Sequence, residues 1–295
     1  MKNYLSYFGY FFVGISIYFL VKIFVGSFDL LHGITVTKEN MLIAILSISL
    51  YLLVYLILSY SWLMLLRDNY PHFNYVDSIS IIGRSQIGKY LPGNIGHFVG
   101  RLVLLPRYMS KKDVSYTLYI ENIVMVFSYI GLGCFYYKYF PIVSIFGQQN
   151  ISLIFLAFLT FSLIAYTGFR FLRKKYEFLK VKNIVFFKII FLSFITSFIG
   201  GLIIYLIIPI FNEGETLPFF QCASGFALSF LAGFIIPGAP GGVGIREFAF
   251  ILLFGSSLTD PIALEVILSF RLVTIIGDIL LFGATYILNF YRLSK

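Results

Sequence analysis

The chain has 295 residues, of which 59% are hydrophobic and only 12% are charged, and its mean hydropathy is +0.92. A soluble protein of this length cannot bury so much apolar surface, so the composition indicates a protein whose solvent is a bilayer. The net charge of +9 would suit a nucleic-acid-binding protein, but the basic residues are scattered over short loops. Basic residues in short loops are typical of the segments between membrane spans, so we expect no nucleic-acid partner.

Six apolar runs reach the roughly 20 residues that a membrane-spanning helix needs. In chain order they cover residues 7–28, 41–66, 115–137, 151–171, 184–211 and 262–291. Because no small-residue cleavage site follows the first run, we expect a retained span rather than a removed signal peptide. Two further apolar segments, residues 79–105 and 219–254, carry charges and are interrupted by Pro and Gly. Each of them lies between the second and the third span of its half.

Both halves thus have the order helix, helix, broken hairpin, helix. We predict an all-α polytopic membrane protein with a single transmembrane domain over residues 1–295, made of repeats at about 1–145 and 146–295. Three spans per repeat is an odd number, so the second repeat is inverted relative to the first. The tips of two re-entrant hairpins would then meet near the middle of the membrane. Irregular backbone at that depth is tolerated only where it is buried in protein or lines a wet cavity.

The distribution of Lys and Arg predicts the orientation. If each broken segment returns to the side from which it entered, thirteen basic residues lie in loops on the side of the amino terminus. The opposite loops carry only Lys38 and Lys138. We therefore expect a multi-pass protein of the cell membrane with both termini in the cytoplasm.

The first broken segment carries Arg84, Lys89 and Arg101 around a Pro-Gly-Asn-Ile-Gly break at residues 92–96. A helix that restarts after such a break exposes backbone N–H groups at the positive end of its dipole, which suits a phosphate or another anion. The second broken segment repeats this logic at residues 240–244 and Arg246. The other interpretation is that the glycines only allow close packing of the hairpin arms and that Arg246 pairs with Glu247 or another acid.

These patterns define two sets of candidate residues. The predicted phosphate-binding residues are Arg84, Lys89, Asn94, Arg101, Arg246 and Arg271. The predicted gating positions, where a side chain would block close approach of the backbone, are Pro92, Gly93, Gly96, Pro240, Gly241, Gly242 and Gly244.

Intramembrane acids form a third set, because a charge at a helix centre costs on the order of 3 kcal/mol unless it is paired or hydrated. Glu121, Glu247 and Asp278 could couple transport to protons or ions, or could form structural ion pairs with Arg101 or Arg271. Arg271 and Asp278 are seven residues apart, so they share one face of the last helix. His97 could titrate near neutrality or act as a hydrogen-bonding packing residue.

Lys22, Lys188 and Glu265 lie near the ends of predicted spans, where long side chains reach the interface. Cys134 and Cys222 both lie in apolar runs, so no disulfide framework and no metal site are predicted. The Gly-x-Ser-x-Gly, His-Glu-x-x-His and P-loop signatures are absent from the sequence, so we expect no cofactor and favour a transporter over an enzyme.

At the two broken segments the chain resembles the lysylphosphatidylglycerol synthase transmembrane-domain family, also called flippase-like integral membrane proteins. The resemblance is carried by residues 88–94 (Gly-Lys-Tyr-Leu-Pro-Gly-Asn) with Gly100 and Arg101, and by residues 240–247 (Pro-Gly-Gly-Val-Gly-Ile-Arg-Glu) with Arg271. It implies movement of lipid or polyprenyl-linked headgroups between leaflets. Similar members that stand alone, without a soluble synthase half, are associated with assembly of cell-surface glycans.

The sequence therefore predicts a flippase that moves an anionic phospholipid or a polyprenyl-phosphate-linked sugar through a basic cavity at the middle of the membrane. Two alternatives stay open: a membrane glycosyltransferase or other lipid-modifying enzyme, and a scaffold subunit of a cell-envelope glycan or lipid pathway. The expected partners are the lipid substrate and, where assemblies form, further copies of the chain or enzymes of the pathway.

Overall fold

The computed structural model describes residues 37–91, 95–135, 181–212, 215–235 and 242–293, together with residues 18, 21, 22, 25 and 26. Predicted span 151–171 and most of predicted span 7–28 lie outside these residues. The described chain is helical and contains no strand. Its elements are α2 (Lys38–Leu66), α3 (Tyr75–Gln86), η1 (Ile87–Tyr90), α4 (Gly96–Val103), α5 (Lys111–Phe135), α8 (Asn183–Phe211), α9 (Phe219–Ile235), α10 (Ile245–Phe254) and α11 (Asp260–Leu293).

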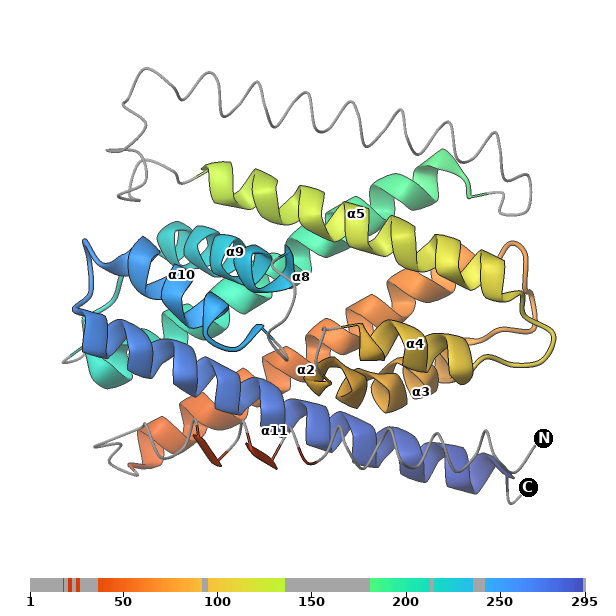
Figure 1. The fold of residues 1–295 in the computed structure, drawn as a ribbon, viewed down its shortest axis with the longest axis horizontal. Coiled ribbons are helices and arrows are strands. Elements are labelled where there is room, and N and C mark those ends of the chain that lie inside the picture. Colours follow the sequence, from red (N-terminus) through yellow and green to blue (C-terminus); the bar gives the residue numbers. More distant parts are fainter. Residues whose placement is uncertain are drawn as a thin grey trace.

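Three of the described helices are long and apolar enough to cross a membrane: Lys38–Leu66, Asn183–Phe211 and Asp260–Asn289. They match the predicted spans 41–66, 184–211 and 262–291. Helix α5, with 25 residues, covers the predicted span 115–137 as far as Phe135, where the described part of this segment ends. It includes Lys111, Lys112, Asp113 and Glu121 and is less apolar than those three helices. All four run along the long axis of the molecule (Figure 1).

Local capping sets where these helices begin. The Thr37 side chain accepts a hydrogen bond from the Asn40 backbone N–H at 3.1 Å and so starts α2. Asn74 and Asp77 form a capping box at the start of α3. This box extends the first arm of the broken segment to Tyr75, four residues before the predicted limit at residue 79.

Helix α2 has a polar buried face and an apolar exposed face, as expected of a helix that is surrounded by lipid. Its buried face carries Ser47, Tyr51, Tyr55 and Ser59, one helical turn apart. Its exposed face carries large apolar side chains, which water would not favour in such number. They are Leu42, Ile45, Leu46, Leu53 and Leu56.

In the structure, each broken segment consists of two helical parts with an interruption between them, as the sequence predicts. The first helix pair consists of α3, η1 and α4, and the second consists of α9 and α10. Their second arms, α4 with 8 residues and α10 with 10, extend only about 12 and 15 Å at 1.5 Å per residue. Because the hydrocarbon core is roughly 30 Å thick, neither of these arms can cross it alone.

Helix contacts in the first half have counterparts in the second half. Helix α2 packs against α3 as α8 packs against α9, and α2 and α8 pack against each other. The last helix of each half packs on the opposite half: α11 contacts α2 and α3, and α5 contacts α8 and α9. Lys182, just before α8, lies 3.1 Å from Asp68, just after α2, so these two helices run antiparallel. The two helix pairs lie toward opposite ends of the long axis (Figure 1).

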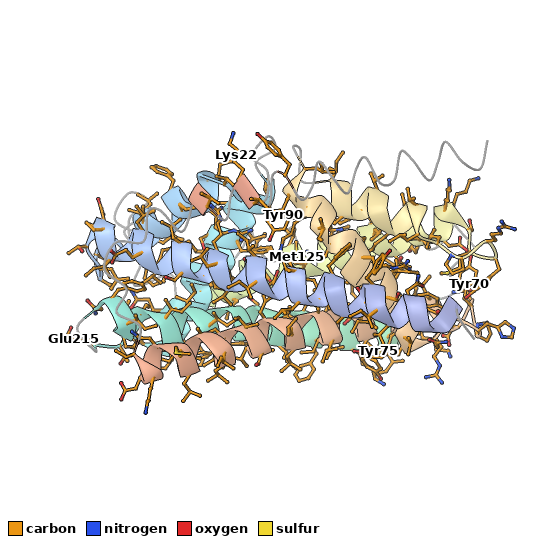
Figure 2. The ribbon with its side chains drawn as sticks, turned by 90° about the horizontal axis from the view of Figure 1, so that it is seen from below. Lys22, Tyr70, Tyr75, Tyr90, Met125 and Glu215 are labelled. Atoms are coloured by element: carbon orange, nitrogen blue, oxygen red, sulfur yellow. The ribbon has the colours of Figure 1, made fainter. Side chains whose placement is uncertain are left out.

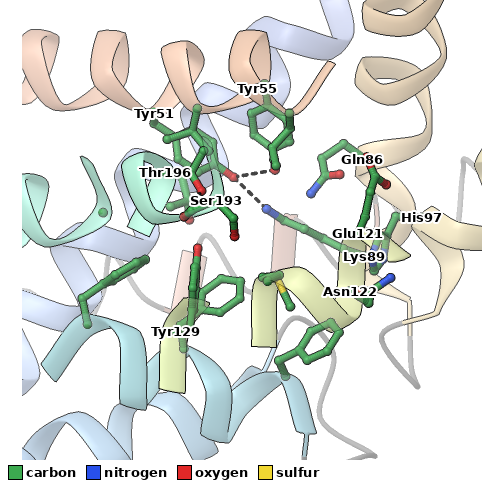
Figure 3. A pocket seen from close by; sticks show the side chains of 18 of the residues that line it. Tyr51, Tyr55, Gln86, Lys89, His97, Glu121, Asn122, Tyr129, Ser193 and Thr196 are labelled. Atoms are coloured by element: carbon green, nitrogen blue, oxygen red, sulfur yellow. Dashed lines mark hydrogen bonds between the residues drawn. The ribbon is translucent and has the colours of Figure 1, made fainter. Parts of the chain in front are cut away.

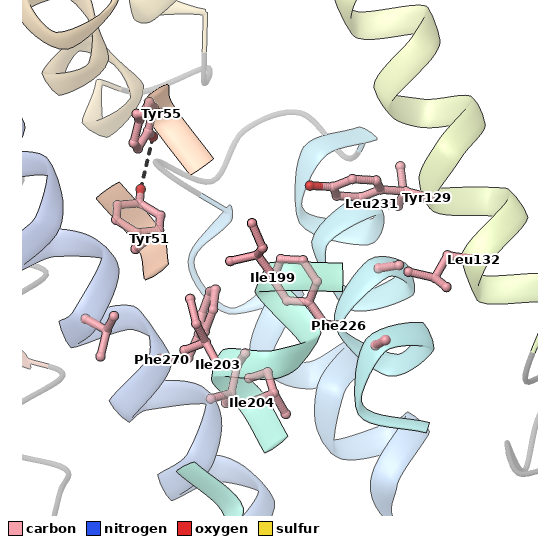
Figure 4. Packing of buried hydrophobic residues seen from close by; sticks show 14 of the residues in the cluster. Tyr51, Tyr55, Tyr129, Leu132, Ile199, Ile203, Ile204, Phe226, Leu231 and Phe270 are labelled. Atoms are coloured by element: carbon pink, nitrogen blue, oxygen red, sulfur yellow. Dashed lines mark hydrogen bonds between the residues drawn. The ribbon is translucent and has the colours of Figure 1, made fainter. Parts of the chain in front are cut away.

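Buried apolar side chains of α8, α9 and α11 pack together in the core (Figure 4). Ile203 and Ile204 of α8 are fully buried there, and the rings of Phe226 and Phe270 lie 5.2 Å apart. Gly200 and Gly201 face Phe226 and Ala223 so closely that a Cβ at either position would collide with α9. Glycine therefore sets the short distance between α8 and α9, in the manner of small-residue contacts between membrane helices.

Candidate functional site

A cavity of about 210 Å³ is lined by residues of both helix pairs together with residues of α2, α5, α8 and α11. Tyr90 and Met125, which line it, lie midway along the molecule, whereas Tyr70 and Glu215 mark opposite ends (Figure 2). At roughly 30 Å³ per water the volume suits about seven waters or one small headgroup. Its charged lining residues are Lys89, Arg101, Glu121, Arg246 and Arg271.

Lys89, at the end of η1, forms an ion pair with Asp278 of α11, with 2.5 Å between Nζ and Oδ2. Asp278 is fully buried and also accepts hydrogen bonds from Tyr90 at 2.6 Å and Tyr51 at 2.9 Å. Lys89 donates to the Tyr51 hydroxyl at 2.9 Å, and Tyr51 and Tyr55 lie 3.0 Å apart through their hydroxyls (Figure 3). This cluster joins the first helix pair to the last helix of the other half.

Arg101 of α4 forms the second buried ion pair, with 2.5 Å between its Nη1 and Glu121 Oε2 on α5. The guanidinium also lies 5.2 Å from the Trp62 ring, a distance that allows a cation–π contact. Arg101 Nε and Glu121 Oε1 are buried without a hydrogen-bond partner among the described atoms. The pair is neutral overall but keeps polar atoms to offer to a ligand.

Glu247 of α10 and Arg271 of α11 form the third pair, at 2.5 Å. The Glu247 carboxylate also accepts a hydrogen bond from the backbone N–H of Gly244 at 2.6 Å. The helix N-terminus that the sequence offers to an anion is therefore occupied here by a carboxylate of the same helix. The proposed pairing of Arg246 with Glu247 is not what the structure has.

Arg246 is the cavity base without a carboxylate partner in the described part of the chain. Its guanidinium lies 4.6 Å from the Phe230 ring centre, and its Nε is buried without a hydrogen bond. Glu121 lines the cavity, and Asp278 and Glu247 lie outside the lining but pair with the lining residues Lys89 and Arg271. Four bases are thus matched by three acids, and Arg246 leaves a surplus positive charge. Such a charge in a low-dielectric site favours an anionic ligand.

His97 also faces the cavity, beside Phe98, with 3.8 Å between their ring centres. Its Nδ1 is buried and has no hydrogen-bond partner among the described residues. The sequence left open that His97 is a packing residue held by hydrogen bonds. Its Nδ1 makes no such bond within the described chain, and the ring faces the candidate site.

The glycines predicted as gating positions take two forms. Gly96 meets the backbone of Gly88 so closely that a Cβ at either position would collide with the other residue. Gly242 and Gly244 have φ angles of 76° and 84°, a region that L side chains rarely adopt. Pro92, Gly93, Asn94, Pro240 and Gly241 lie outside the described residues.

Arg84 is the predicted phosphate-binding residue that the structure places elsewhere. It lines a second cavity of about 180 Å³ between α3, residues 104–106 and the end of α11, and its Nε donates to Ser80 O at 3.0 Å. Five residues separate Arg84 from Lys89, which turns them about 140° apart around a helix. The two bases therefore face different cavities.

Sequence reasoning missed the tyrosines. Tyr51, Tyr55, Tyr90 and Tyr129 all line the cavity. The available signal was the spacing of Tyr51 and Tyr55, one turn apart and flanked one turn away by Ser47 and Ser59, in a span that is otherwise apolar. That polar stripe marks the face of the helix that turns away from lipid.

Two comparisons with known proteins bear on identity. No curated protein matches the chain. The profile of the lysylphosphatidylglycerol synthase TM region matches residues 11–281, which is nearly the whole chain. With its span-length helices, this match makes the chain a multi-pass membrane protein of a lipid-related family. The chain belongs to the lysylphosphatidylglycerol synthase TM region family.

Proposed function

We propose that this protein moves an anionic lipid between membrane leaflets, with the headgroup passing through the central cavity and the tails remaining in the bilayer. The substrate class is a phospholipid or a polyprenyl-phosphate-linked sugar. The single observation that carries the proposal is the surplus positive charge of Arg246 in a buried cavity midway along the molecule. Arg101 Nε adds a second unsatisfied donor to the same space.

The proposed architecture has two inverted repeats in the cell membrane, with both termini in the cytoplasm. Antiparallel packing of α2 and α8 and the exchanged contacts of α5 and α11 support the inversion. Arms too short to cross the membrane, in helix pairs at opposite ends of the molecule, support two re-entrant hairpins entering from opposite faces. Alternate opening of the cavity to each side would then require the two hairpins to move in turn.

Transport is favoured over chemistry on the lipid by the state of the cavity acids. Glu121, Glu247 and Asp278 each pair with a base at 2.5 Å. A general acid or base needs a carboxylate that can reach the reacting atom. These three carboxylates instead hold helices together.

Arg246→Ala tests the function in proteoliposomes, with leaflet-resolved translocation of a fluorescent phosphatidylglycerol as the readout and a lipid-linked phosphosugar as a second arm. Loss of one charge-assisted hydrogen bond, worth about 1.5–3 kcal/mol, should slow translocation roughly 10- to 100-fold. Arg246→Lys should recover part of the rate, since lysine keeps the charge but lacks the planar fork.

The matched control is Lys188→Ala, which removes a base from the exposed face of α8. It should translocate at the wild-type rate. Equal rates for the Arg246→Ala variant and the wild type with both lipids would contradict the proposed function.

A further inference from the structure

We infer that the transported headgroup is a phosphodiester of charge −1 linked to a small uncharged polyol, and that His97, Glu121 and Asn122 bind the hydroxyl groups of this polyol. The inference rests on the proposed function and narrows its substrate class, since it excludes headgroups that carry an amine. Two properties of the central cavity support it: its net charge, and the hydrogen-bonding atoms on the wall formed by α3, α4 and α5.

The charge of the cavity matches an anion of charge −1. Lys89, Arg101 and Arg271 each pair with a carboxylate at 2.5 Å, and Arg246 has no such partner in the described part of the chain. A phosphodiester carries one negative charge and makes the occupied cavity neutral. A zwitterionic headgroup would leave one positive charge uncompensated, and an aminoacylated headgroup would add to it. Because an uncompensated buried charge is costly, the cavity favours a headgroup without an amine.

One wall of the cavity is polar and lies away from Arg246. This polar wall consists of the side chains of Gln86, His97, Glu121 and Asn122. Arg246 instead lies 4.6 Å from the ring centre of Phe230, which lies 5.2 Å from that of Tyr129. Figure 3 shows Tyr129 on one side of the cavity and the polar wall on the other. Since the cavity holds only about seven waters, a headgroup whose phosphate binds Arg246 also reaches the polar wall.

The polar wall offers hydrogen-bond acceptors that lack donors. Glu121 uses Oε2 for Arg101, and its Oε1 is buried without a partner among the described atoms. Asn122 donates through Nδ2 to Leu118 O at 2.7 Å, which leaves its carboxamide oxygen as an acceptor. His97 Nδ1 is likewise buried without a hydrogen bond in the described chain. Hydroxyl groups donate to such acceptors, whereas the oxygens of a phosphodiester cannot.

A hydroxyl suits this wall better than an ammonium because it donates and accepts at once. Arg101 Nε, in the same ion pair as Glu121, is a buried donor without a partner among the described atoms. A hydroxyl that donates to Glu121 and accepts from Arg101 satisfies both residues, whereas an ammonium can only donate. Glu121 also has no charge to spare for an ammonium, since Arg101 already compensates it.

His97 adds a hydrogen-bonding group to the wall without adding charge. It precedes Arg101 by four residues in α4, so the two side chains lie one helical turn apart, and like charges at this spacing repel. The imidazole is therefore neutral in the proposed complex and offers one donor nitrogen and one acceptor nitrogen. Neighbouring hydroxyl groups of a polyol can use both kinds of nitrogen.

Binding calorimetry on the purified full-length protein tests the inference with three short-chain lipids. Dihexanoylphosphatidylglycerol has the charge and the hydroxyls, dihexanoylphosphatidylmethanol has the same charge without hydroxyls, and dihexanoylphosphatidylethanolamine has an ammonium and no net charge. The affinity should fall about three- to tenfold from the first lipid to the second, as expected for the loss of one hydrogen bond. It should fall roughly a further tenfold or more from the second to the third, because a positive charge then stays uncompensated.

His97→Phe is the diagnostic variant, because it keeps an aromatic ring beside Phe98 and removes both ring nitrogens. It should weaken the binding of phosphatidylglycerol about three- to tenfold and leave that of phosphatidylmethanol unchanged. Asn122→Leu should have the same selective effect and covers the case in which the His97→Phe variant does not fold. Arg246→Ala should instead weaken the binding of both anionic lipids by the same factor.

His72→Phe is the matched control, since His72 is an exposed histidine that does not line the cavity. This variant should keep the wild-type preference for phosphatidylglycerol over phosphatidylmethanol.

Glycerol and a single sugar share the polyol chemistry, and a second pair of probes distinguishes them. Citronellyl phosphoglucose is compared with citronellyl methyl phosphate, which has the same tail and charge without the sugar. The larger of the two affinity ratios, glycerol over methyl or glucose over methyl, identifies the polyol. A ratio above one for either pair supports the inference.

Several results would overturn the inference. They are equal affinities for polyol and methyl lipids in both pairs, phosphatidylethanolamine binding as tightly as phosphatidylmethanol, a polyol preference that survives in both the His97→Phe and the Asn122→Leu variant, and no binding of any probe. The translocation assay separates the inference from the proposed function. Polyol-selective binding without translocation would contradict the proposed function alone, and translocation of phosphatidylglycerol without any polyol preference in binding would contradict the polyol site alone.

Discussion

The two pairs Arg101–Glu121 and Glu247–Arg271 occupy corresponding places in the two halves with opposite polarity. In the first half the short arm α4 supplies the base and the following helix α5 supplies the acid. In the second half the short arm α10 supplies the acid and α11 supplies the base. The common requirement is therefore a neutral link between a short arm and the next long helix, whichever side carries the positive charge.

The comparison also shows where the halves differ. Glu247 caps α10 through Gly244 in addition to its ion pair, and the neighbouring Arg246 remains without a carboxylate partner. Arg101 lies beside the ring of Trp62, and the residues on either side of it in α4, Gly100 and Leu102, are uncharged. The surplus charge that could hold a ligand thus comes from the second helix pair.

The largest expected effect is the loss of Glu247. Glu247→Ala removes an ion-pair partner, which costs about 3–5 kcal/mol because Arg271 stays buried and unpaired. It also removes a helix cap worth about 1 kcal/mol. Equilibrium unfolding in detergent should therefore place this variant below the Glu121→Ala variant, which loses the ion pair alone. The reverse order would mean that the cap contributes nothing.

The next test reverses one pair. Arg101→Glu and Glu121→Arg should each destabilise the protein by about 3–5 kcal/mol, whereas the double variant should recover most of that loss. We expect this recovery because the second half already has the reversed arrangement, with the acid on the short arm and the base on the next helix. Free energies of unfolding for the four proteins give the coupling energy, and a double variant as unstable as the sum of the singles would refute the equivalence of the two links.

Glycine contacts allow a smaller comparison. Gly96→Ala should destabilise the first helix pair by roughly 1–3 kcal/mol, since the added Cβ meets the backbone of Gly88, which cannot move aside as the nearby Leu91 side chain can. The matched control is Gly283→Ala in α11, where nothing lies within 4 Å of the added Cβ. That change should stabilise the helix by about 0.5–1 kcal/mol, because alanine is the better helix former. Equal thermal shifts for both variants would argue against the backbone contact.

Arg84→Ala should have the smallest effect on translocation. The residue lies outside the central cavity, so the rate should match the wild type within about twofold. The measurement is the same leaflet-resolved translocation as for Arg246. A loss comparable to that of the Arg246→Ala variant would mean that the headgroup also uses the cavity lined by Arg84.

The sequence predicted the parts of this arrangement that depend on local rules. Pro and Gly interruptions identified both broken helices, and the intramembrane charges identified Lys89, Arg101, Arg246 and Arg271 as cavity residues. The pairing of Arg101 with Glu121 was one of the open alternatives, and the structure has it. All of these follow from hydropathy and from the cost of an unpaired charge.

The remaining pairings depend on how the helices are rotated and packed. Arg271 and Asp278 share a face, but seven residues separate them by about 10 Å along the helix axis, too far for an ion pair. Each instead finds a partner on another element, Glu247 or Lys89. The sequence predicted that Arg84 faces the central cavity, whereas it lines the second one, and the reason is the same. The spacing of charges along a broken helix does not determine which way each side chain points.

The two faces of α2 have a practical consequence. Its exposed leucines and isoleucine, residues 42, 45, 46, 53 and 56, contact none of the ion pairs, whereas Tyr51 and Tyr55 on the other face hold the Asp278 cluster. A water-soluble redesign of the protein would therefore replace side chains on the outer face and leave the inner face as it is. In this helix the redesign would have to preserve the buried polar side chains rather than the apolar ones.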